Sequence, residues 1–294
     1  MNKTVKLNDS VYHMYESNGV YCTLIIGSER ALLIDSGFGC GDLPERASTL
    51  TDKPLMVLNT HGHFDHIQAN NAFSSVLIHK ADVPLLRKNS NLLYKLAFYL
   101  LYLSKSTKAD RKRYLRTLTV RKPKLAYIRD GDVIDLGTAT LTVIETPGHT
   151  KGSVCLLDSA NHYVYSGDTI SNHVWICLKE SLSVQTYVES LERLLPLVDD
   201  SYQIVASHSD VPLRTVVIEK MIHCCRNIDT RKSTAYNHPF CKKSFLYCEG
   251  LEPLMAKYDV RSFEELINKI DMIDKDVFRN GEFVSVVYRK DKLR

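Results

Sequence analysis

Short apolar runs separated by turn residues fill the first quarter of the chain. The runs are about five residues long and are bounded by Gly, Ser and Asp, which is typical of buried strands. They predict strands over residues 11–15, 21–26, 31–34, 55–58 and 75–79. A glycine-rich loop follows the third strand, and a helix is expected over residues 44–50.

The pattern changes to helical spacing over residues 82–122, where leucines recur at three- and four-residue intervals and a more basic helix is expected over 108–118. Strand patterns then return at residues 125–128, 133–136, 140–145, 153–158, 163–166 and 203–206. Two further helices are expected over residues 184–195 and 213–227.

This order of elements predicts an α/β fold in which helices cover sheets. No linker or repeat divides the chain, so we expect one domain over residues 1–294. The helix-rich part, about residues 82–122, is interpreted as an insertion in that domain. Residues 228–294 carry no readable pattern.

Composition is that of a soluble globular protein, with 44% hydrophobic residues, 24% charged residues and a mild net charge of +4. The start of the chain lacks the apolar core of a secretory signal, and the eight cysteines form no C-x-x-C pair. We therefore expect a cytoplasmic protein with reduced thiols.

The longest apolar run covers residues 92–103 and contains Lys95. It is too short to span a bilayer, so no transmembrane segment is predicted, whereas a membrane-surface or lid helix is left open. The run could form one wall of a pocket for an acyl or aromatic group, or could simply pack the insertion onto the fold.

Nine lysines and arginines lie between residues 105 and 124, against the single acidic residue Asp110. One interpretation is attraction of an anionic substrate, a phospholipid surface or nucleic acid, and the other is a solvated helix face. No stable nucleic-acid partner is expected.

Three imidazoles and one carboxylate are packed into six positions directly after the fourth predicted strand. The segment runs Thr60-His61-Gly62-His63-Phe64-Asp65-His66. Histidines at i and i+2 in a loop can converge on one ion, and the two residues that follow can reach a neighbouring ion. Imidazole and carboxylate are ligands of zinc, and of iron or manganese where more oxygen is present.

Three further candidate ligands stand at the ends of later predicted strands. His149 lies in Thr-Pro-Gly-His-Thr, where proline and glycine force a turn, Asp168 lies in Ser-Gly-Asp-Thr, and His208 follows Ala-Ser. Loops at strand ends are where a rigid scaffold presents functional side chains. The other histidines are expected to be structural; they are His13, His79, His162, His173, His223 and His238.

These motifs, in this order, resemble those of the metallo-β-lactamase superfamily. The early Ile-Asp-Ser-Gly at residues 34–37 also fits, and the resemblance covers roughly residues 10–215. It implies a four-layer αβ/βα sandwich of two mixed sheets with outer helices and the metals at one edge.

The resemblance also implies roles for individual residues. His61, His63 and His149 are implied ligands of a first metal. Asp65, His66 and His208 are implied ligands of a second metal, and Asp168 would bridge both. Asp35 would lie beneath the site and orient ligand imidazoles.

Two positions distinguish this chain within the superfamily. Residue 168 is Asp, where zinc β-lactamases with a cysteine ligand carry Cys, and residue 63 is His, where flavo-diiron proteins usually carry Glu. The large inserted domain of the RNA-cleaving branch is not evident. The chain therefore looks like the branch that contains glyoxalase II-type thioesterases and lactonases.

The implied mechanism is hydrolysis by a metal-bridging hydroxide between two divalent ions, with zinc expected and iron or manganese as alternatives. Asp65 could also relay a proton. We expect a small-molecule ester, thioester or lactone as substrate, anionic or with an apolar acyl group. The alternatives are phosphodiester or nucleic-acid hydrolysis, favoured by the basic stretch, and a diiron redox protein. Neither the substrate nor the oligomeric state can be read from the sequence.

Overall fold

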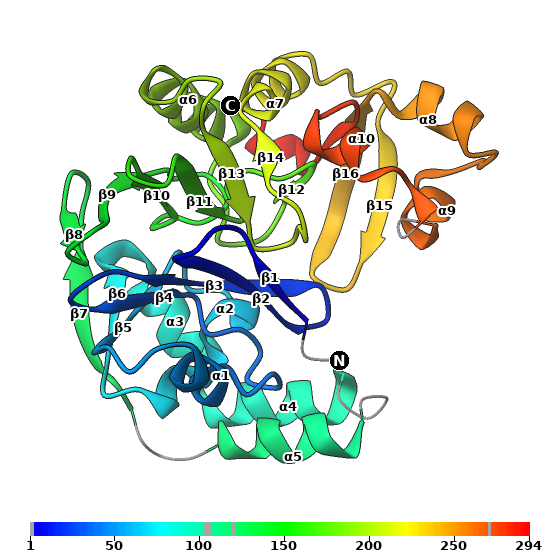
Figure 1. The fold of residues 1–294 in the computed structure, drawn as a ribbon. Helices are drawn as coiled ribbons and strands as arrows, with labels where there is room; N and C mark the ends of the chain where they lie inside the picture. The colour runs from blue at the N-terminus through cyan, green and yellow to red at the C-terminus, as the bar shows by residue number, and fades with distance from the viewer. Residues whose placement is uncertain (1–2, 103–106, 119–121, 270–271) are drawn as a thin grey trace. The chain divides into compact units, whose positions relative to one another are not determined.

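Figure 1 shows a computed structural model, which describes residues 3–102, 107–118, 122–269 and 272–294. The chain forms two compact units. Unit 1 comprises Met1–Glu145, Gly152–Gly167 and Ser207–Asp210, and unit 2 comprises Thr146–Lys151, Asp168–Ala206 and Val211–Arg294. The expectation of a single domain stays a prediction.

The largest sheet of unit 1 contains seven strands in chain order. They are β1 (Thr4–Lys6), β2 (Val11–Ser17), β3 (Val20–Ile26), β4 (Ala31–Ile34), β5 (Leu55–Asn59), β6 (Ser75–His79) and β7 (Lys124–Ile128). β1 to β4 pair antiparallel, whereas β4 to β7 pair parallel, so the sheet is mixed. The predicted strands are present, and β1 is an addition.

Helix α1 (Leu43–Leu50) packs on this sheet because Leu43 and Ala47, four residues apart, lie on one side of the helix. Both residues are buried in a cluster with side chains of the strands, among them Met14, Leu24 and Leu33. This packing supports the end of β4, where Asp35 begins the next loop.

The remaining strands of unit 1 form an antiparallel meander. They are β8 (Val133–Asp135), β9 (Thr140–Glu145), β10 (Val154–Asp158) and β11 (Tyr163–Gly167). β11 is buried along its whole length, including Ser166 and Gly167 at its end.

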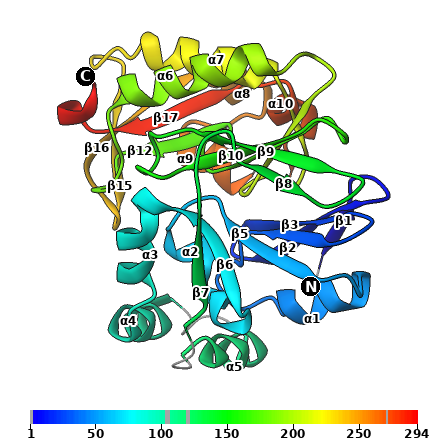
Figure 2. The ribbon, with the colours of Figure 1, turned by 90° about the vertical axis from the view of Figure 1, so that its left-hand side faces the viewer.

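The described residues of the predicted insertion form three α-helices: α3 (Val83–Asn89), α4 (Leu92–Tyr102) and α5 (Lys108–Arg116). α4 and α5 lie side by side in Figures 1 and 2. Lys95 Nζ donates a hydrogen bond to the carbonyl of Thr117 over 2.9 Å, which satisfies the C-terminal end of α5. Lys105 and Arg121 of the basic stretch lie outside the described residues.

Unit 2 contains a four-stranded mixed sheet in the order β12-β17-β16-β15. Its strands are β12 (His173–Ile176), β15 (Thr234–His238), β16 (Cys241–Glu249) and β17 (Val284–Tyr288). The unit also holds the pair β13 (Gln203–Ala206) and β14 (Leu213–Arg214), with helices α6 (Val184–Leu194), α7 (Val216–Arg226), α8 (Leu251–Lys257), α9 (Phe263–Asn268) and α10 (Lys275–Arg279). The described part of the segment 228–294, which carried no readable pattern, therefore contains strands and helices.

The structure corrects the expectation that all eight cysteines are reduced, because it pairs Cys177 with Cys241 as a disulfide. Cys177 follows β12 and Cys241 begins β16, so sheet formation brings the two Cα atoms to 5.7 Å, within the range of a disulfide. The 64 residues between them hid this proximity in the sequence. A cytoplasmic location stays a prediction.

Within the described part of the chain, no helix has the length and apolar character needed to cross a membrane.

Candidate metal centre

The histidine motif of unit 1 begins one residue after β5 ends at Asn59. His61 and His63 lie in the loop, and His63 adopts an extended backbone conformation immediately before the short helix α2 (Phe64–Ile67). Asp65 and His66 therefore lie on a helical turn, while His61 and His63 lie in the non-helical segment before it. The change of backbone places the four side chains in two pairs.

The carboxylate of Asp35 lies beneath the motif and is completely buried. Its two oxygens accept hydrogen bonds of 2.8 Å from the backbone N–H and the hydroxyl of Thr60. Oδ2 also lies 2.8 Å from Nδ1 of His66. Because Nδ1 of His66 faces Asp35, its Nε2 atom is turned toward Asp65. These contacts suit the role predicted for Asp35, which stays a prediction.

Asp65 lies between two imidazoles. Its Oδ2 is 3.5 Å from Nε2 of His66 and 3.4 Å from Nε2 of His208. Although burial by itself would raise the pKa of Asp65, the two neighbouring histidines hold that pKa well below its ordinary value. One ligand atom from each of these three residues lies within 4.8 Å of the others.

His61 and His63 form the second pair in unit 1. Their rings stand nearly perpendicular with centroids 4.7 Å apart. Nδ1 of His61 lies 3.0 Å from the hydroxyl of Thr60, so the ring orientation depends indirectly on Asp35. Both side chains are buried, and one ligand atom of each lies within 4.8 Å of the other.

His208 lies near Asp65 because contacts hold the backbone of its segment against β2 and β3. The N–H of Tyr21 donates to the carbonyl of Ser207 over 2.8 Å, and Nε2 of His13 lies 2.9 Å from the carbonyl of Ser209. His13 also stacks on Tyr21 with ring centroids 4.7 Å apart. His13 is structural, as expected, and it positions the segment that carries His208.

Asp82 and Asn89 support the motif, and the sequence analysis missed both. The carboxylate of Asp82 accepts the N–H groups of Gly62 and Gly152, each over 2.7 Å. The Asn89 side chain donates to the carbonyl of Gly62 over 2.9 Å. Asp82 is the N-cap residue of helix α3, although its side chain makes no capping hydrogen bond. In the sequence, an aspartate at this position indicates only the start of a helix.

Unit 2 carries the two remaining candidate ligands. Nε2 of His149 lies 3.4 Å from Oδ2 of Asp168, and Nδ1 of His149 lies 2.7 Å from the carbonyl of Trp175. The turn before His149 needs glycine, because a Cβ atom on Gly148 would lie 2.7 Å from Cβ of Tyr187. Tyr187 in turn donates its hydroxyl proton to the carbonyl of Thr169, next to Asp168, over 2.7 Å.

The other histidines have contacts outside these groups. His79 pairs with Glu145 and His223 pairs with Glu249, each over 2.8 Å. In unit 2, Nδ1 of His173 lies 2.7 Å from the Ser285 hydroxyl. These contacts agree with the structural roles expected for these histidines.

An aromatic cluster surrounds Phe64, which stands between His63 and Asp65 in the chain. Its ring centroid lies 4.2 Å from that of Phe98 and 5.5 Å from that of Tyr94, both on α4, and 6.1 Å from that of Phe38. One side of α4 therefore packs directly behind the ligand motif.

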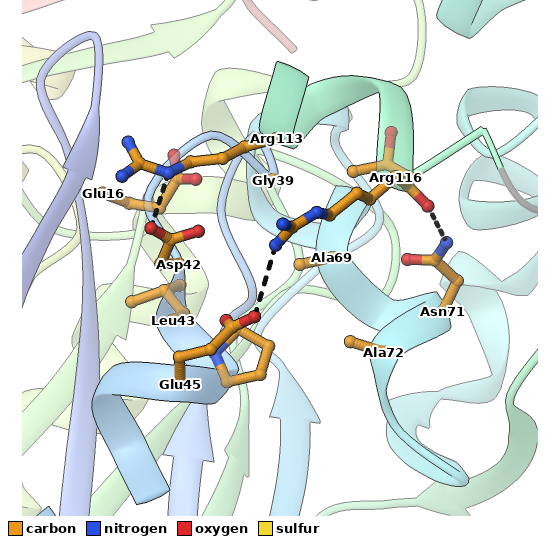
Figure 3. A pocket seen from close by; sticks show the side chains of 12 residues that line it. Glu16, Gly39, Asp42, Leu43, Glu45, Ala69, Asn71, Ala72, Arg113 and Arg116 are labelled. Carbon is orange, nitrogen blue, oxygen red and sulfur yellow. Dashed lines mark hydrogen bonds and ion pairs between the residues drawn. The ribbon is translucent and has the colours of Figure 1, made fainter. Parts of the chain in front are cut away.

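A cavity of about 390 Å³ lies between α1 and α5 in unit 1 (Figure 3). Arg113 pairs with Asp42 over 2.5 Å, and Arg116 pairs with Glu45 over 3.5 Å. The buried carboxylate of Glu16 accepts backbone N–H groups of Phe38, Cys40 and Gly41 at 3.0, 2.5 and 2.7 Å. None of the predicted ligands lines this cavity.

The donor atoms in each unit suit divalent metals. Ligands bound at about 2.0–2.2 Å to one zinc ion can be at most about 4.4 Å apart, close to the spacing among Asp65, His66 and His208. Imidazole nitrogen and carboxylate oxygen are the expected donor types. The residues present therefore fit metal ions.

The sequence profile of the metallo-beta-lactamase superfamily matches residues 17–208. The chain is 35% identical over 198 residues to the acyl-coenzyme A thioesterase MBLAC2 of Gallus gallus, an alignment covering 63% of this chain and 70% of that protein. It is 33% identical to the Homo sapiens protein of the same name, with 66% and 75% covered.

A beta-lactamase domain protein from Burkholderia ambifaria has a similar crystal structure, with a TM-score of 0.57, 17% identity and coverage of 76% of this chain and 73% of that one. The predicted α/β sandwich fold and the prediction of a hydrolase are confirmed. The resemblance inferred from the motifs is confirmed too: the chain belongs to the metallo-beta-lactamase superfamily.

Proposed function

We propose that this hydrolase cleaves acyl thioesters, with acyl-coenzyme A as the model substrate. The observation that carries the proposal is the identity of 33–35% to proteins named acyl-coenzyme A thioesterase. The superfamily profile matches residues 17–208, a range that contains all the predicted ligands. Thioesters are also among the substrates that the motifs favoured, ahead of phosphodiesters.

We further propose that two metal ions are bound by the predicted ligand set. His61, His63 and His149 would hold the first ion. Asp65, His66 and His208 would hold the second, and Asp168 would contact both. When bound, two dications would acidify a shared water and polarise the thioester carbonyl. Zinc is the proposed metal, because imidazole donors predominate over carboxylates.

The chain's own residues contribute orientation and an apolar environment. Asp35 holds Thr60 and His66 by hydrogen bonds, which fixes the ring of a proposed ligand. Phe64 and Phe98 pack in an aromatic cluster directly behind the ligand motif. The side of α4 next to this cluster would form one wall of a pocket for an apolar acyl group.

Hydrolysis of acyl-coenzyme A with chains of different length tests the substrate, with the released thiol followed by a chromogenic disulfide. We expect turnover of thioesters well above that of bis(p-nitrophenyl) phosphate and of RNA. Turnover of a phosphodiester with no thioester hydrolysis would replace the proposal by the phosphodiesterase alternative.

The metal ligands are tested by the variant His61→Ala, with His162→Ala as the control. His162 is exposed, whereas His61 is 1% exposed. We expect His61→Ala to lower both bound metal and activity by at least about 100-fold, more than removal of an outer partner of a ligand costs. Lost metal with unchanged hydrolysis would refute metal-dependent catalysis. Bound iron with reversible redox absorbance and no hydrolysis would favour the diiron alternative.

A further inference from the structure

Helix α4 turns its one charged residue inward and four of its leucines outward. Lys95 is 7% exposed and donates to the Thr117 carbonyl, whereas Leu93 is 76% and Leu100 is 69% exposed. Leu92 and Leu96 are also exposed. We call Leu92, Leu93, Leu96 and Leu100 the leucine stripe. Because Leu92, Leu96 and Leu100 are spaced by four residues, they lie on one face of the helix.

The leucine stripe is separate from the face of α4 that packs on its own unit. Phe98, on the opposite side, packs against the cluster that contains Phe64 and Tyr114. Among the described residues, six of the eleven exposed large apolar side chains lie on α4 and α5, including Leu115. A contiguous exposed apolar face of this kind marks an interaction surface.

Basic side chains lie on α5, the helix beside α4 in Figures 1 and 2, and on α3, which precedes the leucine stripe in the chain. Lys108 and Lys112 of α5 are exposed and make no ion pair among the described residues. Arg87 and Lys88, also exposed, end helix α3 a few residues before the stripe begins. Arg113 and Arg116 differ, because their ion pairs join α5 to the α1 region (Figure 3).

We propose that α4 and α5 together dock on the surface of an anionic lipid membrane. Leucines inserted at the headgroup boundary would bury apolar area, and the lysines of α5 would attract acidic lipids. The exposed leucines would supply the apolar component of this interface, and the basic residues would supply its electrostatic component. Helix α4 would lie in the plane of the membrane rather than span it.

A second copy of this chain is the less suitable occupant. A symmetric contact through the leucine stripe would use the same surface on both molecules. It would bring the Lys108 and Lys112 side chains of both copies toward one interface with the single acid Asp110, which already contacts Arg113. Charge therefore favours an acidic partner surface over self-association.

Co-sedimentation with vesicles tests the proposal on the full chain. We expect binding to phosphatidylcholine vesicles that contain phosphatidylserine, weaker binding to pure phosphatidylcholine, and release by salt. The variant Leu93→Glu/Leu100→Glu should reduce partition roughly tenfold or more. The variant Lys108→Glu/Lys112→Glu should abolish the preference for acidic vesicles.

Val133→Glu is the matched control, because Val133 is 62% exposed on β8. It should bind like the unmodified chain, and circular dichroism should show all variants to be folded. The proposal is overturned if the unmodified chain stays in the supernatant with acidic vesicles, or if the leucine variant binds equally well. A dimer in analytical ultracentrifugation that the leucine variant dissociates, without vesicle binding, would assign the face to a second copy instead.

Discussion

Oδ2 of Asp35 lies 2.8 Å from Nδ1 of His66, and both side chains are completely buried. The pair joins the end of β4 to helix α2, two segments 31 residues apart. A carboxylate on Nδ1 selects the tautomer whose Nε2 can accept a metal. We therefore expect the organisation of the proposed centre to depend on Asp35, which is not among the proposed ligands.

Replacing Asp35 with Asn should lower metal affinity by about 10- to 100-fold, because the amide is a weaker partner for Nδ1 of His66. Competition with a chromophoric chelator measures the effect. Asp52→Asn, in an exposed loop position, should leave affinity unchanged. Equal affinities for the two variants would show that Asp35 does not orient a ligand.

The variant Asp82→Ala should lower the free energy of unfolding by about 2–4 kcal/mol, because the N–H groups of Gly62 and Gly152 both lose their acceptor in a buried position. Urea denaturation measures the change. Asp82→Asn, which retains one carbonyl oxygen, should lose less. The prediction would be wrong if Asp82→Ala and the unmodified chain unfolded at the same urea concentration, because the two hydrogen bonds of Asp82 would then not stabilise the fold.

His13 should make stability depend on pH. Burial lowers the pKa of His13 to about 4, below the 6.5 of an unfolded histidine. Between these values the unfolded state binds more protons, so this contribution is complete above about pH 6.5 and is lost as the pH falls toward 4.

In His13→Gln this titration is absent, while the amide can still donate to the Ser209 carbonyl. With metal removed from both proteins, the unmodified chain should lose up to about 3 kcal/mol more than the variant between pH 6.5 and pH 4. Thermal unfolding across that range measures the difference. Parallel pH profiles would contradict a neutral, buried His13.

The variant Tyr187→Phe should lower the free energy of unfolding by about 1–2 kcal/mol, because it removes the donor to the Thr169 carbonyl beside Asp168. Tyr163→Phe is the comparison, since the buried Tyr163 makes no hydrogen bond among the described residues. Chemical denaturation measures the free energy of unfolding of both variants. Both lose a hydroxyl group, but only Tyr187→Phe also loses a hydrogen bond, so the difference between them reports that bond. If both variants were destabilised equally, the hydrogen bond from Tyr187 to Thr169 would not contribute to stability.

Local patterns predicted much of the fold, because strand and helix formation depend on neighbouring residues. The apolar run before Asn59 and the glycine turn before His149 placed candidate ligands at the ends of strands, as the structure does. The helices of the insertion also follow from leucine spacing. Residues 228–294 were unreadable because β15 and β16 are largely polar on their exposed positions and have no simple alternation.

Contacts between distant segments were not predictable in the same way. Asp82 reads as a helix start, and only tertiary structure brings its carboxylate to Gly62 and Gly152. Cys177 and Cys241 are likewise joined by the strand order of a sheet.

The sequence by itself determined the superfamily and the candidate ligands, because metal donors must follow one another at spacings that backbone geometry allows. Tertiary structure decided which side chains hold those donors in place, such as Asp35 on His66 and His13 on the segment of His208. It also decided that α4 exposes leucines and buries Lys95. Periodicity shows that a helix has an apolar face, but only packing against neighbours determines which face meets solvent.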